Sequence, residues 1–256
     1  MITSFQVTRF KGNIKEVIED FVIEEIPLTL MIGDKELVTL LCCPSDLEDL
    51  ARGFLFTSGL IINPKEIKNI FINREQWIAT IDLADNNKDF DLAFKRLYTS
   101  GCGKGILFYT TADILNKSNI TSQLRIDASR INAFMVEFQG KSEVFKKTGG
   151  VHSAALVDKE HMLIFKEDIG RHNAIDKVIG QGLREKVDFG SKIMISSGRI
   201  SSEVLLKIQK CKIPMVISRS APTAQAVKLA RNMGITLVGF ARGNRMNVYS
   251  AEERIQ

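Results

Sequence analysis

Alternating apolar and polar positions predict the first strands of the chain. Ile26–Met31 and Glu36–Leu41 alternate on either side of the short polar stretch Ile32–Lys35. This pattern predicts a β-hairpin. The same kind of alternation predicts a strand followed by a charged connector in residues 1–24, and a second pair of strands at Ile67–Ile72 and Gln76–Leu83.

One helix is predicted between these two strand pairs. Ser45 and Glu48 have the spacing of a capping box, in which each side chain accepts a hydrogen bond from a backbone N–H at the start of a helix. Apolar residues follow at helical spacing, and the helix is expected to end near Ser58 and Gly59. Because residues 1–98 carry no catalytic constellation, we predict that they form a small α+β lobe that serves as a scaffold.

The second half of the chain changes to a repetition of strands and helices. Asp127 or Ser129 is expected to cap a helix that ends at Gly140, and two strands are expected at Val151–Val157 and Met162–Phe165. Strand and helix then alternate in the order Lys192–Ile195, Ser201–Lys210, Pro214–Ile217, Pro222–Asn232 and Ile235–Phe240. Such units have parallel strands. We therefore predict an α/β lobe in residues 126–256, joined to the first lobe by a connector, residues 99–125.

A dense polar segment, Glu167–Asn173, lies between a predicted strand and a predicted helix. Chemistry in α/β proteins often sits at such a junction. His172 and Arg171 in this segment, and His152 just after a glycine pair, are therefore candidate site residues. A capped turn with a salt bridge is the alternative interpretation, and ordinary hydrogen bonding at a turn is the alternative for both histidines.

Three predicted strands end in turns that contain small residues and arginines. These turns are Ser196–Arg199, Ser218–Ala221 and Ala241–Arg245. Ligands of open parallel sheets bind beyond the carboxyl ends of the strands, and arginine suits phosphate. The turns thus predict an anion site that includes Ser197, Arg199 and Arg219, with plain solvated turns as the alternative.

Composition narrows the classes of function. The 256 residues carry a formal net charge of +5 and 45% hydrophobic residues, which favours a globular protein with anionic partners. No long basic run or aromatic-interleaved basic face is present, so we expect no nucleic-acid ligand. No apolar run is long enough to span a membrane, and the first residues lack the features of a signal peptide, so a cytoplasmic location is predicted.

The four cysteines do not have the pattern of a disulfide framework. Cys42, Cys43 and Cys211 lie in apolar or helical contexts, where burial raises the pKa of a thiol. Cys102 stands between Gly101 and Gly103, with Lys104 two residues after it and Gly105 three residues after it. Accessible backbone and nearby positive charge are what a reactive thiolate needs, so Cys102 is the candidate nucleophile, although a lone loop cysteine is commonly incidental.

Several common motifs are absent from the sequence. It contains no P-loop, no glycine-rich dinucleotide fingerprint after a strand, and no zinc-deaminase signature. The histidines and cysteines do not have the spacing of metal ligands. We therefore expect no structural metal.

Taken together, five segments resemble the formate dehydrogenase accessory sulfurtransferase family, FdhD. The segments are TGGVHSAAL (148–156), EDIGRHNAIDKVIG (167–180), SSGRISSE (196–203), ISRSAPT (217–223) and GITLVGFARGNRMNVY (234–249). The similarity extends over nearly the whole chain, from the first predicted hairpin to Tyr249.

This resemblance implies a function and a set of sites. Members carry sulfur from a cysteine desulfurase to the molybdenum cofactor that formate dehydrogenase receives. The position that matches their persulfide cysteine is Cys102. The cofactor, as bis(molybdopterin guanine dinucleotide), is a bound substrate, and the matching segment is Phe240, Ala241, Arg242, Gly243, Asn244 and Arg245. The resemblance also implies a three-layer α/β/α lobe similar to the cytidine-deaminase fold, and a homodimer.

One position departs from the family pattern. Members often have a second cysteine three residues after the first, where this chain has Gly105. A single thiolate accepts and donates sulfur but cannot resolve its own persulfide through an intramolecular disulfide. Two other classes stay open, namely a cofactor-binding chaperone that moves no sulfur and a nucleotide-binding regulatory module. Sulfur loading at Cys102 would separate the first class from a sulfurtransferase, whereas binding of guanine nucleotide without molybdopterin would favour the second.

The sequence also predicts which residues share a crevice. We expect Gly149–His152 and Arg171–Asn173 to face the same crevice as Cys102. We further expect Arg245 to contribute to binding of a guanine nucleotide.

Overall fold

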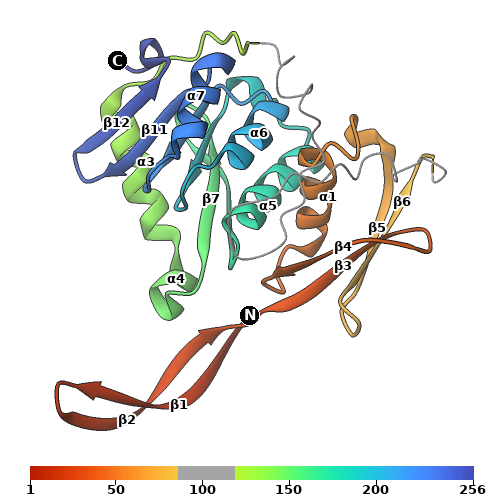
Figure 1. Cartoon of the computed structure of the whole chain (residues 1–256), viewed down its shortest axis with the longest axis vertical. Helices are drawn as coiled ribbons and strands as arrows, with labels where there is room; N and C mark the ends of the chain where they lie inside the picture. The colour runs from red at the N-terminus through yellow and green to blue at the C-terminus, as the bar shows by residue number, and fades with distance from the viewer. Residues whose placement is uncertain (86–118) are drawn as a thin grey trace.

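A computed structural model describes residues 1–85 and 119–256 of the chain (Figure 1). The described residues form three sheets, with two, four and six strands. Cys102 and most of the predicted connector lie outside the described residues. The α/β class predicted from the sequence is confirmed.

The six-stranded sheet has the strand order β12-β11-β10-β9-β7-β8. Its centre is parallel, as predicted: β10 pairs in parallel with β9 on one side and with β11 on the other. Antiparallel pairs flank this centre on both sides. The bounds are β7 His152–Val157, β8 Met162–Asp168, β9 Ile193–Ser196, β10 Met215–Ser218, β11 Thr236–Arg242 and β12 Arg245–Ser250.

Helices cover both faces of this sheet, which confirms the predicted three layers. Met194 of β9 points to the face covered by α5, α6 and α7, whereas Ile193 and Ile195 point to the face covered by α3. This alternation follows from the two-residue period of a strand. The helices are α3 Ala128–Lys141, α4 Glu143–Thr148, α5 Arg171–Arg184, α6 Ser202–Lys210 and α7 Ala224–Met233.

The four-stranded sheet has the order β4-β3-β6-β5 and packs on helix α1 (Leu47–Thr57). The predicted hairpin and the predicted second pair of strands are confirmed, and β3 and β6 join them in parallel. The bounds are β3 Ile26–Ile32, β4 Lys35–Cys42, β5 Ile67–Asn73 and β6 Ile78–Leu83, with a 3-10 turn at Pro64–Glu66.

Helix α1 lies against α5, so the two halves of the chain share a buried contact (Figure 1). Glycines allow the close approach. A Cβ added to Gly53 would stand 1.9 Å from the backbone oxygen of Asp176, and one added to Gly180 would stand 1.8 Å from that of Asp49. Any side chain larger than hydrogen would therefore force the helices apart.

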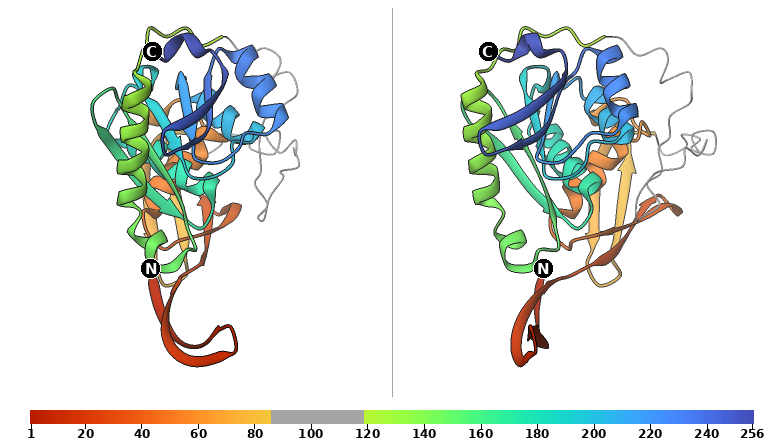
Figure 2. Two further views of the ribbon diagram at one scale, coloured as in Figure 1. Left: turned by 90° about the vertical axis from the view of Figure 1, so that its left-hand side faces the viewer. Right: turned by 60° about the vertical axis from the view of Figure 1, so that its left-hand side comes forward.

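Strands β1 (Ile2–Lys11) and β2 (Ile14–Ile23) form a hairpin that extends away from the rest of the molecule in every view (Figures 1 and 2). We call this hairpin the arm. The prediction of a connector after the first strand was wrong, because residues 14–23 pair along their full length with β1. The charged residues of β2 were interpreted as a loop, but they lie on an exposed strand.

The predicted capping box at the start of α1 does not form. Asp46 is the N-cap residue, in a left-handed conformation with φ 53°, and its side chain makes no cap bond. It instead forms an ion pair with Lys166 of β8. A box with this geometry occurs at Asn63 and Glu66, where Asn63 Oδ1 accepts from Lys65 N at 3.0 Å. The tertiary ion pair thus overrides a local capping signal.

Helix α7 also starts later than predicted. Thr223 is its N-cap and accepts a bond from Ala226 N, so Pro222 precedes the helix. None of the described helices is long and apolar enough to cross a membrane.

Candidate functional site

A cavity of about 510 Å³ lies where the parallel strands β9, β10 and β11 end. Strand β7 runs antiparallel to β9, so its first residue, His152, reaches the same edge. The cavity is lined by Phe145, Gly149, Gly150, Val151, His152, Ile169, Ser197, Arg219, Ser220, Ala221, Phe240 and Arg242. The sequence predicted the strand-end position, but it did not indicate Phe145 or Ile169, which have no charge or motif to mark them.

Guanidinium groups surround this cavity. Arg219 and Arg242 line it and are exposed. Arg171 packs beside it, since a Cβ on Gly198 would stand 2.8 Å from the Arg171 side chain. Arg199 is exposed at the end of the Ser196–Arg199 turn. Concentrated positive charge at the ends of parallel strands favours an anionic ligand such as phosphate.

His152 is fixed at the edge of this cationic region. Its Nδ1 lies 3.3 Å from Ser197 Oγ, which also accepts a hydrogen bond from Ser153 N at 2.9 Å. Burial lowers the pKa of His152, and the nearby Arg171 and Arg199 lower it further. The imidazole is therefore neutral at pH 7, with one ring nitrogen that donates and one that accepts, and Nδ1 is the one that contacts Ser197.

Phe240 has an unusual backbone conformation within this cavity. Its φ is 53°, and the register between β11 and β12 shifts from Gly239 to Arg242, which marks a bulge. The Phe240 N–H donates to Ser220 O at 3.0 Å, while the guanidinium of Arg242 lies 5.7 Å from the centre of its ring. Positive φ at a bulky residue costs energy and is concentrated at functional sites.

The predicted segment Phe240–Arg245 differs from expectation in its geometry. It was placed beyond a strand, but β11 continues to Arg242 and β12 begins at Arg245, so the segment is the end of a β-hairpin. Ala241 is fully buried. Gly243, Asn244 and Arg245 are exposed and lie outside the cavity lining, which from this segment contains Phe240 and Arg242. Gly243 and Asn244 form the two-residue turn that joins β11 to β12.

The polar segment before α5 is organised by Asp168. Its Oδ1 accepts from Gly170 N and Asn173 Nδ2, both at 2.9 Å. Its Oδ2 accepts from Cys43 N at 3.1 Å and pairs with Lys177 Nζ at 2.7 Å. Asp168 and Asn173 therefore form a capped turn with a salt bridge, which was the alternative interpretation of this segment.

His172 is not among the residues that line the cavity. It lies in the first turn of α5, with Nδ1 3.5 Å from Glu203 Oε1 on α6. Burial, followed by the charges of Lys207 and Arg171, lowers the pKa of His172 to about 3. The expectation that both histidines face one crevice holds for His152, which shares the cavity with Gly149, but not for His172. Cys102, which was expected to face the same crevice, lies outside the described residues.

The three described cysteines are buried, as predicted. Burial, together with the negative charge of Asp168, raises the pKa of Cys42 to about 12 and that of Cys43 to about 11. Burial raises the pKa of Cys211 as well. Raised pKa values and burial disfavour the thiolate at all three positions, so none of them is a good candidate nucleophile in the folded protein.

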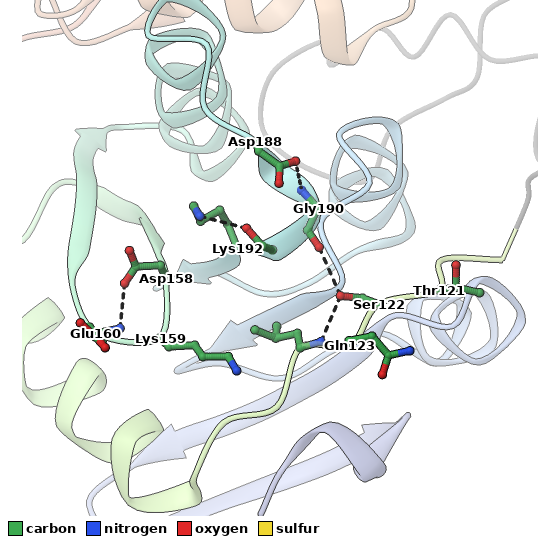
Figure 3. Close-up of a pocket in the computed structure, with 11 residues that line it drawn as sticks. Thr121, Ser122, Gln123, Asp158, Lys159, Glu160, Asp188, Gly190 and Lys192 are labelled. Atoms are coloured by element: carbon green, nitrogen blue, oxygen red, sulfur yellow. Dashed lines mark hydrogen bonds between the residues drawn. The ribbon is translucent and has the colours of Figure 1, made fainter.

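A second cavity, of about 710 Å³, lies at the opposite end of the strands (Figure 3). Its acidic side chains hold local turns: Asp158 Oδ1 accepts from Glu160 N and Asp188 Oδ1 from Gly190 N. Lys192 donates to Ser191 Oγ. The side chains of Asp158, Asp188 and Lys192 are therefore already occupied by neighbouring turns. We favour the cavity of about 510 Å³ lined by Arg219 and Arg242 as the functional site, and call it the cationic cavity.

Comparison with known proteins identifies relatives of the whole chain. Residues 23–256 match the model of the FdhD/NarQ family. A protein of Bacillus subtilis (strain 168) named "Sulfur carrier protein FdhD" is 42% identical over 250 residues, which are 96% of this chain and 94% of that protein. A protein of the same name from Listeria innocua is 41% identical over 261 residues, covering 100% of this chain and 99% of that one.

A solved structure shares the fold. It is that of a putative formate dehydrogenase accessory protein from Desulfotalea psychrophila, with a TM-score of 0.82 and 25% sequence identity. The match covers 100% of this chain and 99% of that chain.

Proposed function

The chain belongs to the FdhD/NarQ family, and we propose that it is a sulfurtransferase that carries sulfur on Cys102 to a molybdenum cofactor for formate dehydrogenase. The carrier role is supported by the printed names of its relatives. The observation that supports Cys102 most directly is the burial of Cys42, Cys43 and Cys211, whose thiols have raised pKa values. Cys102 is the remaining cysteine of the sequence.

The transfer has two chemical steps. The Cys102 thiolate attacks the outer sulfur of a persulfide on the donor, a cysteine desulfurase in the cytoplasm, and releases the donor thiolate. This exchange leaves a persulfide on Cys102 and needs no oxidant or reductant. Delivery as sulfide then takes up two electrons, which a dithiol reductant supplies, and returns the Cys102 thiolate. Gly105 replaces the second cysteine of many relatives, so this reductant is external.

The cationic cavity is the place we propose for the cofactor as substrate. A guanine dinucleotide carries phosphates, and Arg219 and Arg242 supply guanidinium groups that bind phosphate in a bidentate manner. Phe240 offers an aromatic face beside them. Ser197 and neutral His152 offer hydrogen bonds at the other wall.

Replacing Cys102 with alanine tests the carrier role. After incubation with a cysteine desulfurase and cysteine, we expect the native protein to gain the mass of one sulfur atom, at Cys102, and Cys102→Ala to gain none. Cys102→Ala is also expected to lose activation of formate dehydrogenase, whereas Cys211→Ala stays close to native. Full activation by Cys102→Ala would instead support a cofactor chaperone.

Arginine variants test the ligand site. We expect Arg242 to contribute more than Arg245, because Arg242 lines the cavity and Arg245 does not. Loss of a charged hydrogen bond costs roughly 1.5–3 kcal/mol, so Arg242→Ala is expected to weaken GDP binding by about tenfold or more. Calorimetric titration of GDP would measure this, with Arg245→Ala as the matched control. The native affinity should fall with added salt. Equal affinity for Arg242→Ala and native protein would refute this placement.

A further inference from the structure

One wall of the cationic cavity is a continuous stretch of chain, residues 142–153, which we call the wall segment. It contributes more lining residues than any other stretch of the described chain, namely Phe145, Gly149, Gly150, Val151 and His152. Its first half is helix α4, none of whose residues is buried. A helix of six residues is too short to be stable by itself and depends on tertiary contacts. The position of this wall therefore depends on what holds the ends of the segment.

One carboxylate contacts both ends of the wall segment. Ser142 Oγ donates a hydrogen bond to Glu167 Oε1 at 2.7 Å, and Ser153 Oγ lies 3.4 Å from the same oxygen. The two serine hydroxyls lie 2.8 Å apart. Each hydroxyl has a single proton, so the short distances describe a chain in which Ser153 donates to Ser142 and Ser142 donates to Glu167. Glu167 is the acceptor at the end of this chain, and it closes the wall segment into a loop.

The alternation of strand β8 directs Glu167 to this loop. Its neighbours Lys166 and Asp168 form ion pairs with residues of α1 and α5. Glu167 faces the other side of the sheet, where Phe165 packs with residues of α3, because residues two apart on a strand share a face. Ser153 is directly opposite Glu167 in the antiparallel pairing of β7 with β8. The two ion pairs thus fix the direction of the Glu167 side chain between them.

Both halves of the wall segment bring a side chain to the ligand site. Phe145 of α4 lines the cavity and is 45% exposed, and His152 lines it directly before Ser153. The Ser153 N–H donates to Ser197 Oγ at 2.9 Å, which joins this end of the segment to the turn after β9. A displaced wall would therefore alter the aromatic contact of Phe145 and the hydrogen-bonding position of His152 together.

We propose that Glu167 is a positioning residue for ligand binding in the cationic cavity. It acts through Ser142 and Ser153 and is not itself among the residues that line the cavity. The proposal rests on the function proposed above, in which this cavity takes an anionic guanine nucleotide. A wall that is already in place costs the ligand no ordering on binding. Without Glu167, the apparent affinity falls in proportion to the fraction of the protein that keeps the wall in place.

Electrostatics alone gives the opposite expectation for this residue. Glu167 places a carboxylate behind a cavity lined by Arg219 and Arg242. Removing a negative charge near an anion site strengthens anion binding, whereas loss of a positioning residue weakens it. Glutamine separates the two effects, because its amide oxygen still accepts a hydrogen bond from Ser142 but carries no charge. The sign of the change in affinity therefore distinguishes positioning from a simple effect of charge.

Calorimetric titration of GDP tests the assignment. Glu167→Ala is expected to bind GDP about tenfold more weakly than native protein, which corresponds to a wall in place about a tenth of the time. Glu167→Gln should bind at least as tightly as native protein. Glu143→Ala, which removes an exposed carboxylate from α4, is the matched control and should not weaken binding. Native or tighter binding by Glu167→Ala would overturn the proposal, whereas a native protein that binds no GDP would refute the ligand site itself and the role of Glu167 with it.

Ser142→Ala removes the same hydrogen bond from its other end, so it tests the proposal even if Glu167→Ala does not fold. It is also expected to weaken GDP binding. Because residues in one hydrogen-bond network are not additive, the double variant should bind GDP about as weakly as Glu167→Ala alone. Losses that multiply in the double variant would show that the two side chains act separately, and would overturn the proposal.

Amide hydrogen exchange measures the wall itself, with no ligand present. Exchange in residues 143–150, followed by mass spectrometry, should be faster in Glu167→Ala than in native protein, because a segment held by fewer contacts opens more often. Glu167→Gln should exchange at the native rate. Unchanged exchange in Glu167→Ala would show that Glu167 does not hold the wall segment.

Discussion

Replacing Gly180 of α5 with alanine is expected to destabilise the fold by roughly 3 kcal/mol or more, the upper end of the cost of overpacking. The new methyl group would stand 1.8 Å from Asp49 O, which is backbone and cannot rotate away. Helices α1 and α5 would have to separate. The measurement is the midpoint of chemical denaturation followed by circular dichroism, at unchanged slope.

Gly140 of α3 provides a matched control for this substitution. No atom lies within 4 Å of a Cβ added there. Alanine in a helix is more stable than glycine by roughly 0.5–1 kcal/mol, so Gly140→Ala is expected to raise the midpoint. The same chemical change should therefore have opposite signs at the two sites. A Gly180→Ala protein as stable as the native one would contradict the close helix crossing.

Replacing Lys207 with methionine is expected to have a comparable effect. Its Nζ lies 2.7 Å from Asp176 Oδ2, and the Lys207 and Asp176 side chains are 4% and 1% exposed. Thr57 Oγ1 donates to Asp176 Oδ1 at 2.7 Å. Burial already raises the pKa of Asp176. Removing one partner of a buried ion pair leaves the other charge uncompensated and costs roughly 3–5 kcal/mol.

The double variant Lys207→Met with Asp176→Asn separates charge from packing. It removes both charges, so it should be more stable than Lys207→Met alone. Lys228→Met, on the exposed side of α7, should change the unfolding free energy by less than about 0.5 kcal/mol. If Lys207→Met and Lys228→Met unfold at the same midpoint, the ion pair contributes nothing.

Local periodicity explains what the sequence predicted well. The strands and helices from β9 to β11 were predicted because each carries a complete apolar face, such as Ile193 and Ile195 against α3. Arginines directly after predicted strands can also be recognised from the sequence alone. Parallel topology brings those ends together, so Ser197 and Arg219 were correctly placed near one another.

Tertiary contacts explain what the sequence could not predict. Ser45 and Glu48 fit a capping box, but Asp46 takes another conformation because Lys166 pairs with it from β8. His172 lies in a polar segment, yet its ring is buried against Glu203 of a helix that begins 30 residues later, at Ser202. The positive φ of Phe240 accompanies a β-bulge, and no residue type in this segment predicts that bulge.

The crossing of α1 and α5 also sets an order of events while the chain is being made. Thr57 and Asp176 are 119 positions apart, and Thr57 and Lys207 are 150 apart. At about 5–20 residues per second, α1 leaves the ribosome roughly 6–24 s before α5 exists. Throughout that interval the α1 face containing Gly53 has no partner, and contacts of such long range also slow folding. The growing chain is therefore expected to rely on chaperones until α5 is complete.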